Sequence, residues 1–331
     1  MPVKTLVSIQ YLRAVAALAV VAYHTLQWLH GGFEVGRAGV DIFFVISGLI
    51  MWRITAEREV SPADFLWRRV TRVVPAYWLA TLALAVIALG WPAFLVHVRP
   101  TGSHLALSLF FVPHNDPEGL PFPLLAPGWT LTYEAVFYLL FAAALAFARD
   151  LRLLVVTVGL VAIAAAGFIY HPAYTLGANP MMLQFAAGAW LGKLATDGAL
   201  PGRAWGLFLL GAGLAAFAAL AITGYVNELW RPLIWGVPAL AMVAGAISLE
   251  AHGPVFASGA LRRLGDASYS IYLWHIMIVA AVAHALGTGR PWLVFLAAFA
   301  AAILAGLMAR EVVEKPALAL LRRGLYPRRR H

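Results

Sequence analysis

The sequence has no cysteine among its 331 residues, and only 12% of its residues are charged. Without cysteine the chain forms no disulfide, Cys-ligated zinc site or Fe–S cluster, and no acyl group can be carried on a protein thiol. Hydrophobic residues make up 62% of the chain, more than a soluble core of this size can bury. The composition therefore predicts an all-α, polytopic integral membrane protein.

Apolar stretches long enough to cross a bilayer recur along the whole chain. About 17 to 25 mainly apolar residues span the hydrocarbon layer. A shorter run at 104–113 is expected to lie at the interface or to re-enter, and the first run is interpreted as a retained helix rather than a signal peptide. About ten transmembrane helices are predicted, near 6–28, 37–55, 74–95, 129–148, 151–170, 180–196, 203–223, 231–250, 268–286 and 291–311.

Lysine and arginine are distributed unevenly between alternate loops. The net charge of +9 is not gathered in one patch, so no nucleic-acid partner is predicted. With the N-terminus inside, the inner segments hold 19 Lys and Arg residues and the outer segments hold 4. This asymmetry predicts an N-in, C-in protein of the cell inner (plasma) membrane, surrounded by membrane lipids. We expect a single transmembrane domain over 1–331 with a short basic cytoplasmic tail from about 315; whether it forms a homo-oligomer is left open.

Arg13 and His24 are ionisable residues within the first predicted helix. Such residues cost about 2.5–3.5 kcal/mol to insert, so they indicate a functional site by default. Eleven positions return to within about 20° of the same helix face and separate the two side chains by roughly 16 Å, about the reach of an extended pantetheine arm. One face then carries a cation toward the cytoplasm and an imidazole toward the outside. Alternatively, Arg13 snorkels to the inner interface and His24 lies among the outer headgroups.

Two carboxylates are predicted at the depth of His24. Asp41 lies about four residues inside the outer end of the second span, and Glu134 lies about five residues inside that of the fourth. Either can orient the imidazole as the third member of a catalytic triad does; for Asp41 the alternative is a structural contact to Arg37 or to a neighbouring helix. Nearby aromatic rings suit packing on a sugar or an ordinary interfacial belt; they are Trp129, Tyr133 and Tyr138.

The second span also contains the small residues Ser47 and Gly48. Because no G-x-S-x-G nucleophile elbow occurs anywhere in the chain, Ser47 is not expected to be a nucleophile. The pair is expected instead to allow close packing between helices.

Basic and aromatic residues near the inner interface are candidate cofactor ligands. Guanidinium forks suit phosphate oxygens, although a topogenic or lipid-headgroup role is the alternative. The loop before the third span, together with the start of that span, supplies Arg68, Arg69, Arg72 and Tyr77. A second group, on the inner half of the ninth predicted helix, can line the access path of a cofactor or make ordinary helix contacts; it consists of Tyr269, Ser270 and His275.

Five segments, in their order along the chain, resemble the acyltransferase 3 family of membrane O-acyltransferases, specifically its exopolysaccharide-modifying branch. The resemblance extends over nearly the whole chain, and the residues that carry it are Arg13 and His24 with ten residues between them, GVDIFFVISG at 39–48, RRVTRVVPAYW at 68–78, GWTLTYEAVFY at 128–138 and SYSIYLWH at 268–275. The resemblance implies a ten-helix core in which His24 is the catalytic base, Glu134 supports the site, and the CoA phosphates face Arg13, Arg68, Arg69 and Arg72.

The function that this resemblance implies is O-acyl transfer, most simply acetyl transfer. Acyl-CoA, with acetyl-CoA expected first, donates from the cytoplasm to a hydroxyl of an extracytoplasmic or lipid-linked polysaccharide, and no metal is expected. Direct transfer and an acyl-histidine intermediate both remain open. Two alternatives are a proton-coupled transporter of a small solute, because buried His, Asp and Glu also form proton relays, and an acyltransferase acting on a lipid or another small acceptor.

Overall fold

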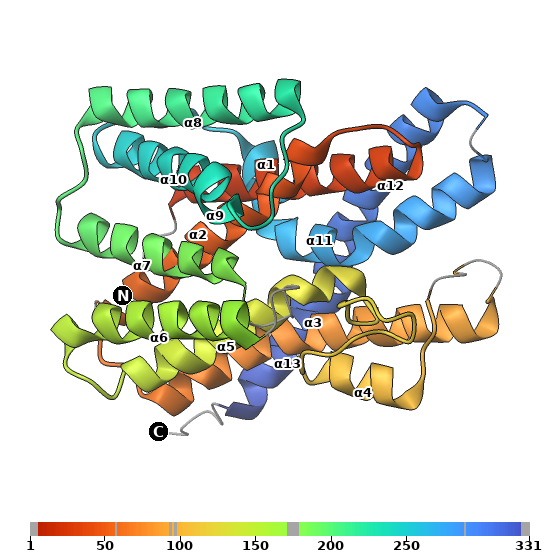
Figure 1. The fold of residues 1–331 in the computed structure, drawn as a ribbon, viewed down its shortest axis with the longest axis horizontal. Coiled ribbons are helices and arrows are strands. Elements are labelled where there is room, and N and C mark those ends of the chain that lie inside the picture. The colour runs from red at the N-terminus through yellow and green to blue at the C-terminus, as the bar shows by residue number, and fades with distance from the viewer. Residues whose placement is uncertain are drawn as a thin grey trace.

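The computed structural model describes residues 6–56, 58–92, 95, 98–170, 179–287 and 289–325, and these parts contain helices and no strand. Figure 1 shows the helices running mostly side by side. The α-helices are α1 (Val7–Trp28), α2 (Ala38–Ala56), α3 (Pro62–Gly90), α4 (Gly102–Leu109), α5 (Trp129–Ala144), α6 (Arg149–Tyr170), α7 (Leu183–Thr196), α8 (Arg203–Thr223), α9 (Arg231–Ile234), α10 (Gly236–Ala251), α11 (Gly259–Leu286), α12 (Pro291–Ala309) and α13 (Lys315–Leu325).

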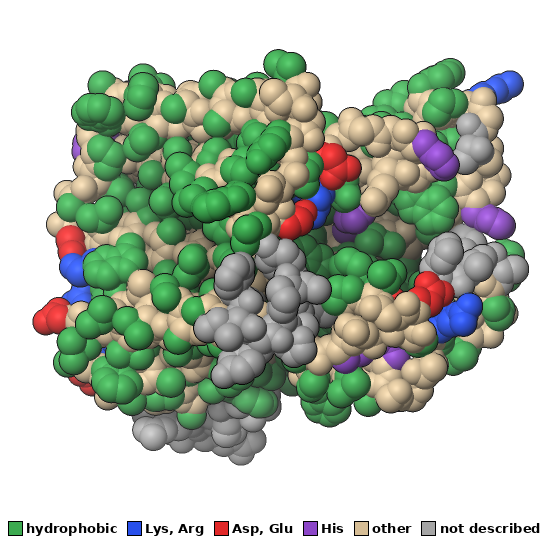
Figure 2. Space-filling view, in the orientation of Figure 1, with side chains coloured by type: hydrophobic (Ala, Val, Ile, Leu, Met, Phe, Trp, Pro, Cys, Tyr) green, Lys and Arg blue, Asp and Glu red, His purple; other side chains and the backbone are tan. Residues whose placement is uncertain are grey.

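The prediction of an all-α polytopic membrane protein is confirmed. Within the described part of the chain, eight helical segments are long and apolar enough to cross a membrane. The other two predicted spans are also helical, but α5 has 16 residues and α7 has 14. The run predicted to be interfacial or re-entrant contains α4, a helix of 8 residues. Figure 2 shows hydrophobic side chains over most of one face, as expected where lipid is the solvent.

Helix α3 begins twelve residues before the predicted span, at Pro62 rather than at 74. Proline suits the first turn of a helix, and the Ser61 side chain accepts a hydrogen bond from the Asp64 backbone N–H at 3.1 Å. The arginines that the sequence placed in a loop therefore lie on a helix. Because α3 continues through Pro75, its basic first half and its apolar second half belong to one continuous helix.

Small residues let the central helices approach closely. A Cβ atom on Gly48 of α2 would lie 2.0 Å from the Phe185 carbonyl oxygen of α7, and one on Gly188 would lie 2.0 Å from the Val45 carbonyl oxygen. The predicted packing role of Gly48 is thus confirmed, and it fixes α2 against α7. Helix α11 approaches α1 equally closely, because a Cβ atom on Gly265 of α11 would lie 1.9 Å from the Gln10 carbonyl oxygen of α1.

Helices distant in sequence surround the centre of the molecule. Helix α1 packs against α2 and α11, and α3 packs against α5 and α11. Figure 1 shows α3, α5 and α13 on one side of this centre, with α8 and α10 on the other. After α12 the chain makes a π-helical turn, Arg310–Glu314, and continues as α13 to Leu325. The expected basic tail from about 315 therefore begins as a helix, and its remainder lies outside the described residues.

Candidate functional site

Five helices, α1, α2, α3, α5 and α11, line a partly open pocket of about 130 Å³ near the middle of the fold. Apolar residues of α2, such as Phe43 and Phe44, form one wall. The polar and titratable residues of the lining are Arg13, Ser47, Arg69, Arg72, Thr130, Glu134, Tyr138, Ser268, Tyr269 and Tyr272. Six of the residues predicted from the sequence as site residues thus line one pocket, although they are spread over more than 250 positions of the sequence. They are Arg13, Arg69, Arg72, Glu134, Tyr138 and Tyr269.

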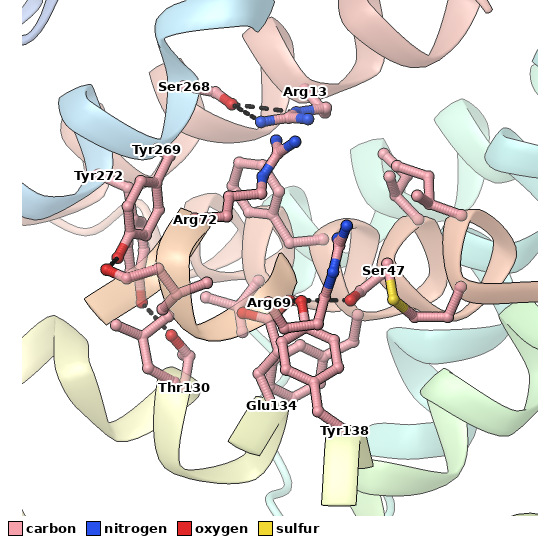
Figure 3. A pocket seen from close by; sticks show the side chains of 18 residues that line it. Arg13, Ser47, Arg69, Arg72, Thr130, Glu134, Tyr138, Ser268, Tyr269 and Tyr272 are labelled. Carbon is pink, nitrogen blue, oxygen red and sulfur yellow. Dashed lines mark hydrogen bonds between the residues drawn. The ribbon is translucent and has the colours of Figure 1, made fainter. Parts of the chain in front are cut away.

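Three arginines give this pocket a positive charge. Arg13 donates from Nε and Nη2 to the Ser268 hydroxyl oxygen at 3.1 and 3.0 Å. Figure 3 shows the guanidinium of Arg72 extending toward that of Arg13, while Arg69 lies beside Glu134 and Tyr138. The Arg69 Nε is buried and has no hydrogen-bond partner among the described residues. A buried donor left unpaired beside two like charges favours an anionic ligand.

Glu134 is an acidic residue of the pocket lining. Its Oε1 accepts hydrogen bonds from the Ser47 hydroxyl at 2.8 Å and from the Tyr138 hydroxyl. These bonds come from α2 and from the next turn of α5, so they hold the carboxylate in one orientation. Sequence reasoning treated Ser47 as a packing residue and missed its bond to Glu134, because no local pattern connects positions 47 and 134.

His24 lies outside the pocket lining and pairs with a second histidine. The ring centroids of His24 and His275 are 5.1 Å apart, and Tyr23 contacts His24 at 4.7 Å between centroids. His275 is fully buried, and its Nδ1 lies 2.7 Å from the Tyr272 carbonyl oxygen. Tyr272 also lines the pocket, so this one residue connects the arginine-rich pocket with the histidine pair.

Asp41 is buried in an ion pair of its own. Its Oδ2 accepts from Arg231 Nη2 at 2.9 Å, and its Oδ1 accepts from Gln184 Nε2 at 2.6 Å. This is the structural contact to neighbouring helices that the sequence left open. Sequence reasoning counted Arg231 only as an outer-loop charge; its position at the start of an apolar helix was the available signal that it needs a buried partner.

The same cluster continues into the loop before α9. Glu228 accepts hydrogen bonds from Arg37 and, at 3.2 Å, from Arg231 Nη1. Partial burial raises the pKa of Glu228, but the positive charges of Arg231 and Arg37 outweigh this effect, so its pKa lies below the ordinary value. Glu228 therefore stays ionised at neutral pH and joins the loop to the start of α2.

The three predicted catalytic residues have different contacts in the structure. Glu134 lines the pocket with Arg13, His24 faces His275, and Asp41 is bonded to Arg231. His24 lies eleven positions after Arg13 on α1, so the pocket and the histidine pair lie at two different levels of one helix.

Several other predicted residues lie outside the pocket lining. Arg68 is exposed on α3, and the Ser270 hydroxyl donates to Glu314 Oε2 at 2.6 Å. Tyr77 is buried and donates to the Ser108 carbonyl oxygen at 3.0 Å. The rings of Trp129 and Tyr133 contact each other at 5.5 Å between centroids. Among the described residues, no group of three or more His, Cys, Asp or Glu is arranged to hold a metal ion.

Comparison with known proteins relates this chain to acyl-transferring membrane proteins. A family model described as an acyltransferase domain matches residues 6–310. The chain is 40% identical over 309 residues to the exopolysaccharide production protein ExoZ of Rhizobium meliloti, and the match covers 91% of this chain and 95% of that protein. No solved structure matches the chain.

Two further relatives carry O-acetyltransferase names. The peptidoglycan O-acetyltransferase OatA of Listeria monocytogenes is 28% identical over 353 residues, covering 92% of this chain and 54% of that protein. The O-acetyltransferase OatA of Staphylococcus aureus is 25% identical over 304 residues, covering 81% of this chain and 49% of that protein. The chain spans about half the length of these two relatives.

Proposed function

Because the chain belongs to the acyltransferase family whose model matches residues 6–310, and is an enzyme of that class, we propose that it transfers an acyl group, most simply acetyl, from acyl-CoA to a hydroxyl of an extracytoplasmic or lipid-linked polysaccharide. The observation that carries this proposal is the positively charged pocket at Arg13 of α1, with the imidazole of His24 further along the same helix. It offers an anion site and a base at two levels of one helix.

The arginines of the pocket are the proposed site for the CoA phosphates. Arg13, Arg69 and Arg72 line it, and the unpaired Nε of Arg69 supplies a donor that a phosphate oxygen can satisfy. The roughly 16 Å rise from Arg13 to His24 along α1 is comparable to the length of a pantetheine arm. A donor held at the arginines can therefore present its thioester near His24.

His24 is the proposed general base. It takes the proton of the acceptor hydroxyl while that oxygen attacks the thioester carbonyl, the carbon–sulfur bond breaks, and the CoA thiolate leaves. The proton on His24 then passes to the thiolate, so the enzyme returns to its starting state. Because the chain has no cysteine, direct transfer needs no protein thiol.

The acceptor and the orientation are proposed from different observations. The exopolysaccharide production protein, similar along 95% of its own length, favours a polysaccharide acceptor. The bias of Lys and Arg toward alternate loops supports an N-in, C-in protein of the inner membrane; in that orientation the Arg13 level of α1 is the one nearer to cytoplasmic acyl-CoA. Membership of an acyltransferase family argues against the transporter alternative.

The test is transfer of radiolabelled acetyl from acetyl-CoA to membrane glycans by the wild type and by His24→Ala. We expect the wild type to label glycan and His24→Ala to lose at least about 100-fold in rate, the usual contribution of a general base. His252→Ala is the control for loss of an imidazole elsewhere, because His252 is an exposed histidine outside the pocket, with its Nδ1 bonded to the Ser248 carbonyl oxygen at 2.9 Å.

The outcomes separate the parts of the proposal. Label in a lipid fraction instead of glycan would replace the acceptor and keep the reaction. Equal labelling by His24→Ala and wild type would refute His24 as the base, and no labelling by any variant would refute the donor or the acceptor.

A further inference from the structure

A general base works only in the correct tautomer, and this requirement applies to His24 if it acts as proposed above. A neutral imidazole carries one N–H donor and one acceptor lone pair. The nitrogen that takes the proton must present its lone pair to the acceptor hydroxyl. The other nitrogen then carries the hydrogen, and the group that accepts this N–H sets the tautomer.

Asp41 is held by partners other than His24. Its two carboxylate oxygens already accept hydrogen bonds from Gln184 and Arg231, and the residue is fully buried. Glu134 is bonded by Ser47 and Tyr138 within the pocket. Both carboxylates that the sequence offered as orienting groups are thus engaged elsewhere.

His275 has a free acceptor next to His24. Its Nδ1 lies 2.7 Å from the Tyr272 carbonyl oxygen, and because a carbonyl only accepts, Nδ1 must carry the hydrogen. The lone pair of neutral His275 is therefore on Nε2. This atom is buried and has no hydrogen-bond partner in the described part of the chain, and His275 is 0% exposed.

The two rings are close enough to meet. Their centroids are 5.1 Å apart with 40° between the ring planes, and His24 is only partly buried, so the proposed contact requires that the His24 ring turn a nitrogen toward Nε2. The other titratable neighbours are Tyr23, whose ring contacts His24, and Arg37, which lies 6.0 Å over the Tyr23 ring. The Tyr23 hydroxyl accepts from Gln27 Nε2 at 3.2 Å.

We propose that His275 is a positioning residue that accepts the N–H of His24 at its Nε2 and so holds the base in the tautomer that the reaction needs. His275 keeps its own hydrogen on Nδ1 throughout. When His24 takes the proton of the acceptor hydroxyl, both His24 nitrogens are protonated, and the bond to His275 stabilises that cation. The proton leaves with the CoA thiolate, so no proton is transferred to His275.

Two isosteric substitutions separate this role from simple packing. In His275→Gln the side-chain oxygen reaches the place of Nε2, so an acceptor is kept. In His275→Asn the amide N–H reproduces only the Nδ1 bond to Tyr272, and the acceptor is lost. We expect kcat to fall about 100-fold in His275→Asn and less than about tenfold in His275→Gln, with KM for acetyl-CoA unchanged in both.

The result that overturns this inference is equal kcat for His275→Gln and His275→Asn, whether both are active or both are inactive. Elution of each variant as wild type in detergent, together with an unchanged KM, shows that it is folded. His252→Asn controls for loss of an imidazole elsewhere. A fully active His24→Ala would instead refute the base itself, so failure of the proposed function is recognised separately.

A spectroscopic readout tests the tautomer directly. With ¹⁵N-histidine incorporated, the protonated nitrogen of His24 should be fixed in the wild type and in His275→Gln and should become a mixture of tautomers in His275→Asn. A mixture already present in the wild type contradicts the inference.

Discussion

Arg68 and Arg69 are neighbours in the sequence but have different surroundings in the fold. Arg69 lines the pocket and has an unpaired Nε, whereas Arg68 is exposed on the outer face of α3. A charge-assisted hydrogen bond contributes about 1.5–3 kcal/mol. Arg69→Ala should therefore raise KM for acetyl-CoA about 10- to 100-fold, and the matched control Arg68→Ala should change it less than about threefold. Equal effects in steady-state assays would assign both arginines to general attraction of the donor.

Asp41 and Arg231 form a buried pair, with side chains that are 0% and 3% exposed. Removing one partner of such a pair costs about 3–5 kcal/mol, because the other charge is left buried without a counterion, whereas replacing both by apolar residues is often nearly neutral. Asp41→Leu should lower the thermal unfolding temperature of the detergent-solubilised protein strongly, and adding Arg231→Met should restore part of the loss. A double variant as unstable as the two single losses combined would show that the pair is not coupled.

Residue types at the site were predictable from the sequence, but their partners were not. Arg13, Glu134 and His24 stand out because ionisable residues are costly inside membrane helices. Depth along a helix was then used to group Glu134 with His24, but depth does not say which side chains contact each other. Depth gives one coordinate, whereas the bonds of Glu134 to Ser47 and Tyr138 depend on how α2 and α5 pack.

At the scale of elements, the contact between α2 and α7 depends on glycine. A side chain at Gly48 would meet backbone atoms of Phe185 and Ala189, which cannot move aside, whereas nothing lies within 4 Å of a Cβ at Gly211 on α8. Gly48→Ala should therefore destabilise the protein by about 1–3 kcal/mol in thermal unfolding, as overpacking does, and Gly211→Ala should not. A stable Gly48→Ala variant would mean that α2 and α7 can separate at little cost.

The loop that carries Glu228 should respond to acid. A carboxyl whose pKa is lowered in the folded state adds stability above its ordinary value of 4.5 and loses it as pH falls through the lowered value. Unfolding temperature should thus decline below about pH 4.5, and Glu228→Gln should be less stable at neutral pH with a smaller decline. The effect should be modest because the Glu228 side chain is 38% exposed. Parallel pH curves for the two proteins would contradict this assignment.

Element boundaries were predictable where hydropathy changes sharply and uncertain where polar residues extend a helix. The start of α3 was missed because a basic first half reads as a loop in a hydropathy scan, although Ser61 followed by Pro62 is a typical helix start. The helical segment that follows α12 was missed for the same reason, since KPALALLRRGL has a polar face.

For the whole molecule, the membrane class follows from the composition alone, since 62% hydrophobic residues and repeated long apolar runs leave lipid as the only suitable solvent. The assembly of the pocket could not be derived this way. Its lining comes from α1, α2, α3, α5 and α11, and a periodic pattern in one helix contains no information about which of the others it will contact.

The orientation of the whole chain in the membrane can be tested directly. Because the chain has no cysteine, a cysteine introduced at a chosen position is the single site for thiol labelling. The charge bias predicts that the α4–α5 connection faces outward and the α7–α8 connection faces the cytoplasm. Asn115 and Ala199 are exposed residues of these two connections. In intact cells a membrane-impermeant maleimide should label Asn115→Cys, and it should label Ala199→Cys only after the inner membrane is permeabilised. The reverse pattern would place the arginine pocket on the outer side, out of reach of cytoplasmic acyl-CoA, and would overturn the proposed direction of transfer even if the family assignment stands.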